Sequence, residues 1–179
     1  RDTYTIRILD ENIEEVELNN FDALNIAEEK EQLYIAIGEV ELITTSIGPN
    51  VLPIIAKDIA EGLKLTVKNN NTKLLDIIAC ENMISGSDFL KTEVFKHLSE
   101  QEQEFVNKYV GFPNSAVDRI VPAQKHDDVL LVEVEKFCEW VIEADKIKVE
   151  SNRNIEQVHY VEDLNPFIER KLFTVNTGH

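Results

Sequence analysis

Residues 40–82 read VELITTSIGPNVLPIIAKDIAEGLKLTVKNNNTKLLDIIACEN, and they contain the strongest periodic signals in the chain. The two ends of this stretch, 40–47 and 73–82, are short apolar runs with the length of buried strands. Between them Ile55, Ile59 and Leu63 recur at helical spacing, and Pro53 falls in the first helical turn, where proline is tolerated. The stretch therefore predicts a strand, a helix and a second strand in sequence.

The flanking sequence continues the alternation of strands and helices. Residues 4–18 predict a β-hairpin around the turn DEN, and residues 28–39 predict a short helix. Ser87 is a candidate N-cap for the next helix. The further predicted elements are a helix after a capping-box pattern at 99, strands at 114–122 and 128–135, a short amphipathic helix at 136–144, a strand at 156–163 and a helix from 164. Strands that are apolar on both faces and alternate with helices predict a largely parallel α/β sheet.

Composition narrows the classes of partner. The chain has 18 basic and 34 acidic residues and a formal net charge of −16, so its surface repels nucleic acid and anionic membranes. No apolar run approaches the ~20 residues that span a bilayer. The two cysteines, Cys80 and Cys138, are typical of reduced cytosolic thiols, and the histidines and cysteines show no zinc-ligand spacing. We expect a cytoplasmic, metal-independent protein that acts on a small molecule.

The predicted strand at 40–47 leads into the polar segment ITTSIGPN, residues 43–50. In parallel α/β sheets, ligands gather beyond the carboxyl ends of the strands. Thr45, Gly48 and Asn50 are therefore candidate ligand contacts, with Gly48 allowing close approach of the backbone. A glycine turn with an asparagine cap explains the same residues equally well.

Two other predicted strands end in unusual polar residues. Asn82 follows an apolar strand and can both donate to and accept from a substrate oxygen, although asparagine is also a common turn former at such positions. Asp118 and Arg119 lie side by side in an apolar run. Adjacent strand residues face opposite ways, so these two are not expected to pair with each other.

The sequence ends in ERKLFTVNTGH, which carries Lys171, Asn176 and His179. A helix advances ~100° per residue, so these three side chains can share one broad face. A buried lysine can act as a general base toward an alcohol, an amide can hold the reacting oxygen, and a histidine can orient the hydroxyl. Such a set suits metal-free alcohol oxidation with a nicotinamide cofactor. The alternative is a helix with an exposed lysine and a polar cap.

The pattern Lys-x4-Asn-x2-His resembles the signature of the polyol-specific long-chain dehydrogenase/reductase family. The strings TTSIGPNVLPIIA, IIACENM, NSAVDRIVP and ERKLFTVNTGH resemble the branch that interconverts D-mannitol 1-phosphate and D-fructose 6-phosphate with NAD. The resemblance runs over essentially the whole chain. It implies a Rossmann-like, mainly parallel sheet with a β-hairpin excursion, ending at the start of a helical domain.

The resemblance also implies roles for single residues. Lys171 matches the general base, and Asn176 and Asn82 match the amides that hold the reacting oxygen. His179 matches the histidine that positions the substrate. The substrate-binding positions would be Asp118 for the polyol and Arg119 for the phosphate, although a structural ion pair explains Arg119 as well. The loop that carries Thr45, Gly48 and Asn50 lies where the family passes the nicotinamide half of NAD.

The chain also departs from the family pattern. The family opens with a strand and a Gly-x-Gly-x-x-Gly turn, and neither is present here. We therefore expect residues 1–150 to be an incomplete dinucleotide-binding domain, and residues 151–179 to be a linker strand and the first helix of a catalytic domain. Such a fragment is expected to be inactive. The alternatives are a related polyol or hexuronate dehydrogenase acting on an unphosphorylated substrate, and a non-catalytic acidic α/β interaction domain.

Overall fold

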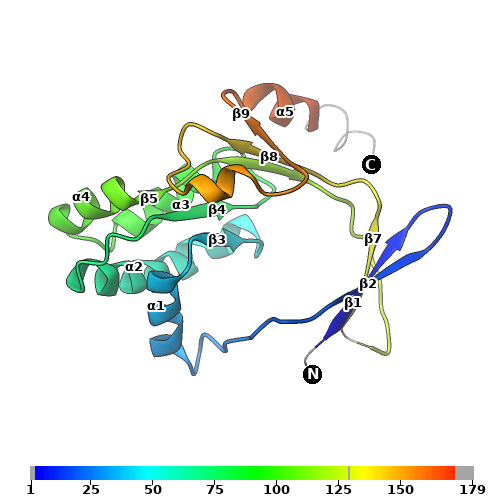
Figure 1. The fold of residues 1–179 in the computed structure, drawn as a ribbon, viewed down its shortest axis with the longest axis horizontal. Coiled ribbons are helices and arrows are strands. Elements are labelled where there is room, and N and C mark those ends of the chain that lie inside the picture. Colours follow the sequence, from blue (N-terminus) through cyan, green and yellow to red (C-terminus); the bar gives the residue numbers. More distant parts are fainter. Residues whose placement is uncertain (1–2, 129, 172–179) are drawn as a thin grey trace. The chain divides into compact units, whose positions relative to one another are not determined.

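The computed structural model describes residues 3–128 and 130–171. They form two compact units, of which the smaller combines residues 3–23 with Asp118–Glu139 and the larger combines Leu24–Val117 with residues 140–171. Figure 1 shows the elements of both units along the chain. No helix in the described ranges has both the length and the apolar character that crossing a membrane requires.

The larger unit is built on the parallel sheet β3-β4-β5. Its strands are β3 (Leu42–Thr45), β4 (Leu75–Ala79) and β5 (Val110–Gly111). The short helix η1 (Pro49–Val51) and the long helix α2 (Leu52–Lys68) connect β3 to β4, as a parallel crossover requires. The strand, helix and strand predicted from residues 40–82 are confirmed, as is the parallel α/β class.

Both faces of β4 are covered, which explains why all five of its residues are buried. Ile77 packs in the main core with residues of α2, and the neighbouring Ile78 packs with Ile142 and Ile147. Adjacent strand residues point to opposite faces, so the two isoleucines belong to different layers. The predicted run of apolar residues at 73–82 reflects this double burial.

Three further helices complete the main core. They are α1 (Lys30–Glu39), α3 (Gly86–Phe95) and α4 (Glu100–Tyr109). Gly62 of α2 faces α1 so closely that a Cβ built on it would lie 2.6 Å from Ile37 Cδ1. The predicted capping box at the start of α4 is present, with Ser99 Oγ accepting from the N–H of Glu102.

The prediction that Ser87 caps α3 is wrong. The N-cap position belongs to Ser85, which has a left-handed backbone, and Ser87 lies inside the helix. The buried hydroxyl of Ser87 instead accepts a hydrogen bond from the N–H of Ala79 at 2.9 Å. Ser87 therefore ties α3 to the end of β4.

A second sheet has the order β6-β8-β9, and all of its residues except Asp118 and Glu139 belong to the larger unit. Its strands are β6 (Ser115–Asp118), β8 (Glu139–Glu143) and β9 (Val158–Val161), and the short helices η2 (Glu150–Arg153) and α5 (Asn165–Arg170) flank β9. The prediction of a short amphipathic helix at 136–144 is wrong, because this segment contains β8. Val141 and Ile142 are both fully buried, which a strand covered on two faces allows and a one-sided surface helix does not.

The carboxylate of Asp76 joins the two sheets at the start of β4. It is fully buried and accepts hydrogen bonds from the main-chain N–H groups of Lys148 at 2.8 Å and Val149 at 3.1 Å. A third bond comes from the side-chain Nδ2 of Asn152 at 3.0 Å. Gly111 is its neighbour in the parallel register of β4 and β5. These bonds satisfy a charge that burial would otherwise destabilise.

The smaller unit is the three-stranded sheet β2-β1-β7. Strands β1 (Tyr4–Leu9) and β2 (Glu14–Leu18) form the predicted antiparallel hairpin, and β7 (Leu131–Glu135) pairs with β1 in parallel. Arg7 of β1 pairs with Glu15 on one side and with Glu133 on the other, at 2.8 Å each.

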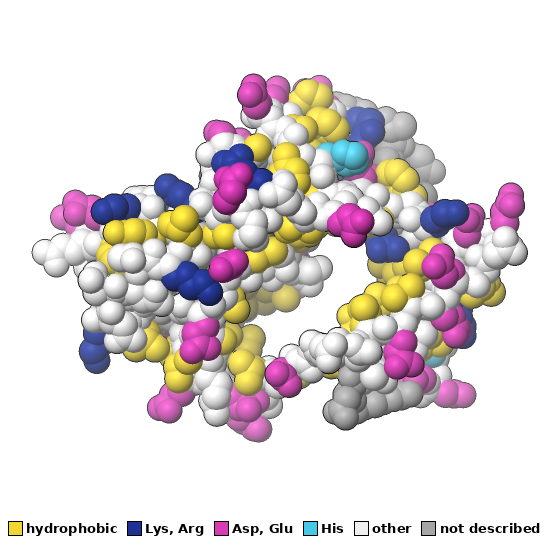
Figure 2. Space-filling model, in the orientation of Figure 1, with side chains coloured by type: hydrophobic (Ala, Val, Ile, Leu, Met, Phe, Trp, Pro, Cys, Tyr) yellow, Lys and Arg dark blue, Asp and Glu magenta, His cyan; other side chains and the backbone are white. Residues whose placement is uncertain are grey.

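Acidic side chains are spread over the face of the protein drawn in Figure 2, as the net charge of −16 leads one to expect.

Candidate active site

A small cavity in the larger unit lies where β4, β6 and α5 end or begin. Its volume is about 50 Å³. The residues that line it come from the loop after β4, from β6 and from the end of α5: Glu81, Asn82, Met83, Ile84, Ser115, Ala116, Ile168 and Lys171. Two residues predicted to be catalytic, Asn82 and Lys171, thus lie on the wall of the same cavity although they are far apart in the sequence.

Lys171 directly follows α5 and is half-buried. Its Nζ donates a hydrogen bond to the main-chain carbonyl oxygen of Val117, in β6, at 2.6 Å. The side chain therefore reaches back to the second sheet and is held at the cavity. A primary amine so fixed can exchange a proton with a ligand that enters the cavity.

Asn82 is exposed and follows Glu81 in the loop after β4. Ser115, on the opposite wall, donates from its hydroxyl to the carbonyl oxygen of Ala79 at 3.1 Å. Since Ser87 binds the N–H of the same alanine, the end of β4 is held by two serine hydroxyls. The amide of Asn82 is thus presented from a firmly anchored strand end.

Glu81 is the acidic residue of this site, and the sequence alone does not indicate a role for it. It is 7% exposed. Its Oε1 accepts from the Thr45 hydroxyl at 2.8 Å and from the Ile47 N–H at 3.1 Å, and its Oε2 accepts from the Gly48 N–H at 2.8 Å. One carboxylate therefore connects the loop after β4 to the loop after β3.

The three predicted cofactor contacts lie in or beside the loop after β3. Thr45 is buried with its hydroxyl bound to Glu81, and Asn50 is exposed in η1. Gly48 has a φ of 91°, in the region that favours glycine, and a Cβ added there would meet nothing within 4 Å. The loop thus presents an open main-chain surface at Gly48.

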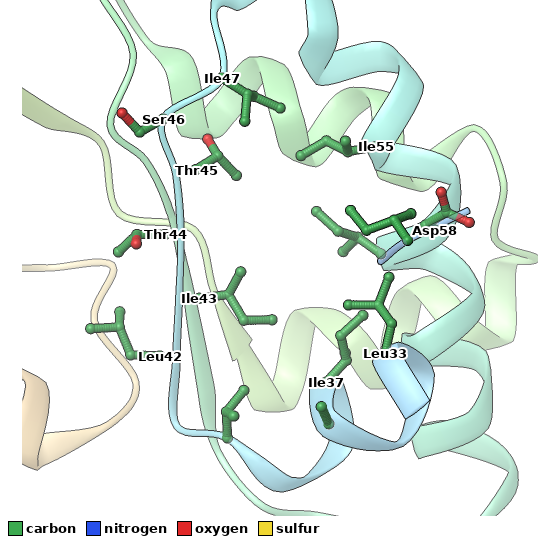
Figure 3. A pocket seen from close by; sticks show the side chains of 14 residues that line it. Leu33, Ile37, Leu42, Ile43, Thr44, Thr45, Ser46, Ile47, Ile55 and Asp58 are labelled. Carbon is green, nitrogen blue, oxygen red and sulfur yellow. The ribbon is translucent and has the colours of Figure 1, made fainter. Parts of the chain in front are cut away.

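A second, apolar cavity of about 430 Å³ lies between β3 and the helices α1 and α2. Figure 3 shows Ile43 and Thr45 on the side of β3 that faces these helices, and Leu42 and Thr44 on the other side. Asp58 is the acidic residue of this cavity. Its carboxylate accepts from the Tyr34 hydroxyl at 2.9 Å and pairs with Lys30 at 3.0 Å.

Asn114, just before β6, organises the beginning of α3. Its Oδ1 accepts from the N–H groups of Ser87 and Asp88, and its Nδ2 donates to the carboxylates of Asp88 and Glu143. Burial by itself would raise the pKa of Asp88, but the bonds from Asn114 and Lys146 hold that pKa below its usual value. This network holds the beginning of α3 against the second sheet.

The predicted substrate contacts Asp118 and Arg119 are adjacent. Asp118 is the last residue of β6 and is 9% exposed. The Nε of Arg119 is buried without a hydrogen-bond partner among the described residues, and no ion pair joins Arg119 to any of them. Two other predicted residues, Asn176 and His179, lie outside the described residues.

The structure also bears on nucleophilic and metal chemistry. Burial raises the pKa of the Cys80 thiol to about 11, so the thiol is protonated at neutral pH. Within residues 3–128 and 130–171, no cluster of His, Cys, Asp and Glu is arranged to hold a metal ion. The groups that the cavity offers are thus an amine, an amide and a hydrogen-bonded carboxylate.

The parallel sheet, its helical crossover and the polar loops at the strand ends define a Rossmann-like domain. The family model described as the mannitol dehydrogenase Rossmann domain matches residues 1–157, and the chain belongs to this family.

Curated relatives extend the comparison beyond this domain. The chain is 50% identical over 179 residues to a mannitol-1-phosphate 5-dehydrogenase of Lacticaseibacillus casei, and 51% identical over 176 residues to one of Streptococcus pneumoniae. The matches cover 100% and 98% of the chain but 46% of each relative. The chain thus spans about half the length of these relatives.

Solved structures show the same fold at low sequence identity. A ternary complex of Pseudomonas fluorescens mannitol 2-dehydrogenase with NAD and D-mannitol matches 95% of the chain and 44% of its own, with a TM-score of 0.78 at 17% identity. A substrate-free D-sorbitol dehydrogenase matches 99% of the chain and 46% of its own, with a TM-score of 0.81 at 16% identity. The predicted Rossmann-like fold is confirmed.

Proposed function

We propose that the protein carrying this chain is an NAD-dependent oxidoreductase that interconverts D-mannitol 1-phosphate and D-fructose 6-phosphate. The observation that carries the proposal is the meeting of Lys171 and Asn82 at one cavity. It is made in a chain whose curated relatives, at about 50% identity, are named mannitol-1-phosphate 5-dehydrogenase. We also propose a cytoplasmic location, which the two free thiols favour.

Lys171 is the proposed general base. In alcohol oxidation its neutral amine accepts the proton of the substrate hydroxyl, and in ketone reduction its ammonium returns that proton. The hydrogen bond to the Val117 carbonyl holds Nζ in place in the ammonium form. Because the amine is half-buried, the proton passes between lysine and substrate with limited competition from water.

Amide and charged side chains complete the proposed substrate site. Asn82, together with Asn176, donates to the oxygen on which negative charge develops, and His179 orients the reacting hydroxyl. Asp118 accepts hydrogen bonds from polyol hydroxyls. Arg119 pairs with the phosphate, a role supported by the absence of an ion pair to any residue in the described part of the chain.

The loop after β3 fits the nicotinamide end of NAD. Gly48 leaves its outer face open, Asn50 is exposed, and Thr45 lies at the start of the loop. When bound, NAD supplies the acceptor for the hydride of the alcohol. We propose that residues 1–150 belong to the dinucleotide-binding domain and residues 151–179 lead into the catalytic domain. Because the chain spans about half of its relatives, we propose that it is inactive by itself.

The test is turnover by the full-length gene product. NADH consumption is measured with fructose 6-phosphate, fructose and fructuronate, in the wild type and in Lys171→Ala. The matched control is Lys68→Ala, which removes an exposed lysine at the end of α2. Rapid turnover of the phosphate alone, lost by about 10³-fold in Lys171→Ala and kept in the control, supports the proposal.

Other outcomes point elsewhere. Turnover of an unphosphorylated sugar would assign the protein to a related polyol or hexuronate dehydrogenase. A wild type without activity toward any of the three substrates would refute the proposed reaction and favour a non-catalytic acidic domain. For the 179-residue chain, a cofactor titration that showed tight NAD binding would contradict its proposed inactivity.

A further inference from the structure

We propose that Glu81 is a positioning residue that shapes the loop after β3 for the nicotinamide ring of the cofactor, which carries no negative charge, and closes the loop to phosphate. This inference rests on the proposed function. It concerns the one carboxylate that both lines the cavity of Lys171 and bonds the loop of Thr45 and Gly48, within the described residues.

The contacts begin where the ladder of β3 and β4 ends. Thr45 pairs with Ala79 in parallel register, and the Cys80 N–H donates to the Thr45 carbonyl at 2.9 Å. Beyond this point the two chains separate, so the N–H groups of Ile47 and Gly48 have no strand partner. The carboxylate of Glu81 accepts both of them and replaces the missing ladder bonds.

A side chain whose two terminal atoms both accept hydrogen bonds fits this arrangement best. The three groups that face it, one hydroxyl and two N–H groups, all donate, and Glu81 forms no ion pair with a described residue. A glutamine could accept at its oxygen, but its NH₂ would face an N–H donor. The loop geometry therefore depends on the two acceptor oxygens of Glu81 as well as on its shape.

The same contacts change what the loop can bind. Successive main-chain N–H groups at a glycine turn form a concavity that attracts phosphate. Here the Glu81 carboxylate already occupies these N–H groups, and its charge repels a second anion. What remains open is the outer side of Gly48, where a Cβ would meet nothing within 4 Å. The nicotinamide ring, which is cationic in NAD+ and neutral in NADH, is not repelled by the Glu81 carboxylate, whereas a phosphate is.

Glu81 is also tied to the catalytic amide. It precedes Asn82 in the chain, and both residues line the cavity that Lys171 closes. A shift of the Glu81 side chain would move the cofactor loop relative to Asn82. We therefore expect loss of Glu81 to impair both nicotinamide binding and turnover, and to leave the adenosine end of the cofactor unaffected.

The experiment compares two ligands on the full-length protein. NADH and ADP-ribose, which lacks the nicotinamide, are titrated against the wild type, Glu81→Gln and Thr45→Val, and kcat with fructose 6-phosphate is measured for each. Glu104→Gln, an exposed change on α4, is the matched control. We expect Glu81→Gln to weaken NADH binding about 10-fold and to lower kcat, with ADP-ribose affinity within about 2-fold of the wild type.

Thr45→Val keeps the shape of the side chain and removes one donor to Glu81. It should weaken NADH binding in the same direction by a smaller factor, and it serves as the second variant if Glu81→Gln fails to fold. Equal loss of NADH and ADP-ribose affinity, or no loss of either, would show that Glu81 is only structural. A wild type that neither binds NADH nor reduces fructose 6-phosphate would refute the proposed function itself.

Discussion

The Nζ of Lys171 donates a hydrogen bond to the carbonyl oxygen of Val117 at 2.6 Å, joining the residue after α5 to β6. A main-chain carbonyl is a neutral acceptor, so it holds the ammonium in place without pairing its charge. We propose that the lysine exchanges a proton with the substrate while this bond holds it in place. Substitutions can test the anchoring role and the proposed proton-transfer role one at a time.

Lys171→Arg and Lys171→Met distinguish these roles. Arginine can still donate to Val117 but does not release its proton at working pH, whereas methionine can do neither. If the lysine is a base, both variants lose about 10³-fold in kcat while circular dichroism stays that of the wild type. An arginine variant with near-normal kcat would mean that the positive charge alone is needed.

Gly111→Ala is expected to destabilise the larger unit by about 3 kcal/mol. An added Cβ would collide with the Asp76 carboxylate and lie 2.5 Å from the Lys146 carbonyl oxygen, and the carboxylate cannot retreat without breaking its own hydrogen bonds. Urea unfolding followed by circular dichroism measures the loss. Gly38→Ala is the control, since its Cβ would be 3.3 Å from the more adaptable Thr66 hydroxyl. Equal stability of the two variants would contradict the packing argument.

Gly62→Ala tests the contact between α1 and α2. Alanine improves helix propensity by about 1 kcal/mol, but its Cβ would lie 2.6 Å from Ile37 Cδ1, so we expect a net loss of about 1–2 kcal/mol. In an Ile37→Ala background that atom is gone, and the same change should cost less. Thermal or urea unfolding of all four proteins gives the coupling. Additive effects would show that the helices move apart freely.

The two cysteines should react with an alkylating agent at different rates in the folded protein. The pKa of Cys80 is raised to about 11 by burial, whereas Cys138 is exposed. At pH 8, iodoacetamide should therefore modify Cys138 well before Cys80, as peptide mass spectrometry would show, and equal rates are expected only in urea.

Because the folded state holds the Cys80 proton more tightly, the stability of the folded state should fall as pH rises from about 9 to 11. Cys80→Ala should remove that part of the decline.

The elements that could be predicted from sequence are those with a strong period of their own. The strand, helix and strand within 40–82 follow directly from β-branched runs and from helical spacing in α2. A helix was wrongly predicted for residues 136–144 because Phe137, Trp140 and Val141 also have helical spacing. Pairing of Trp140 with Val158 in β9 selected the strand instead, and that partner lies beyond any local window.

The site residues that could be predicted from the sequence are those whose side-chain groups indicate a particular chemistry by themselves. Lys171 and Asn82 were chosen for their functional groups, and the fold brings them to one cavity. No role for Glu81 could be predicted, because its three donors become its neighbours only through the register of β3 and β4. An acidic residue two positions beyond one strand, opposite a glycine turn beyond the next, is the signal that could have found it.

The position of β3 at the margin of its sheet has a practical consequence. In the described part of the chain β3 pairs with β4 alone, and an apolar cavity runs along it. An unpaired row of backbone donors and acceptors beside an apolar wall is a template for β-pairing between molecules. Expressed in isolation, the polypeptide is therefore expected to aggregate as its concentration rises, and a lysine introduced at Thr44, which is exposed on the other side of β3, should improve its recovery from the soluble fraction.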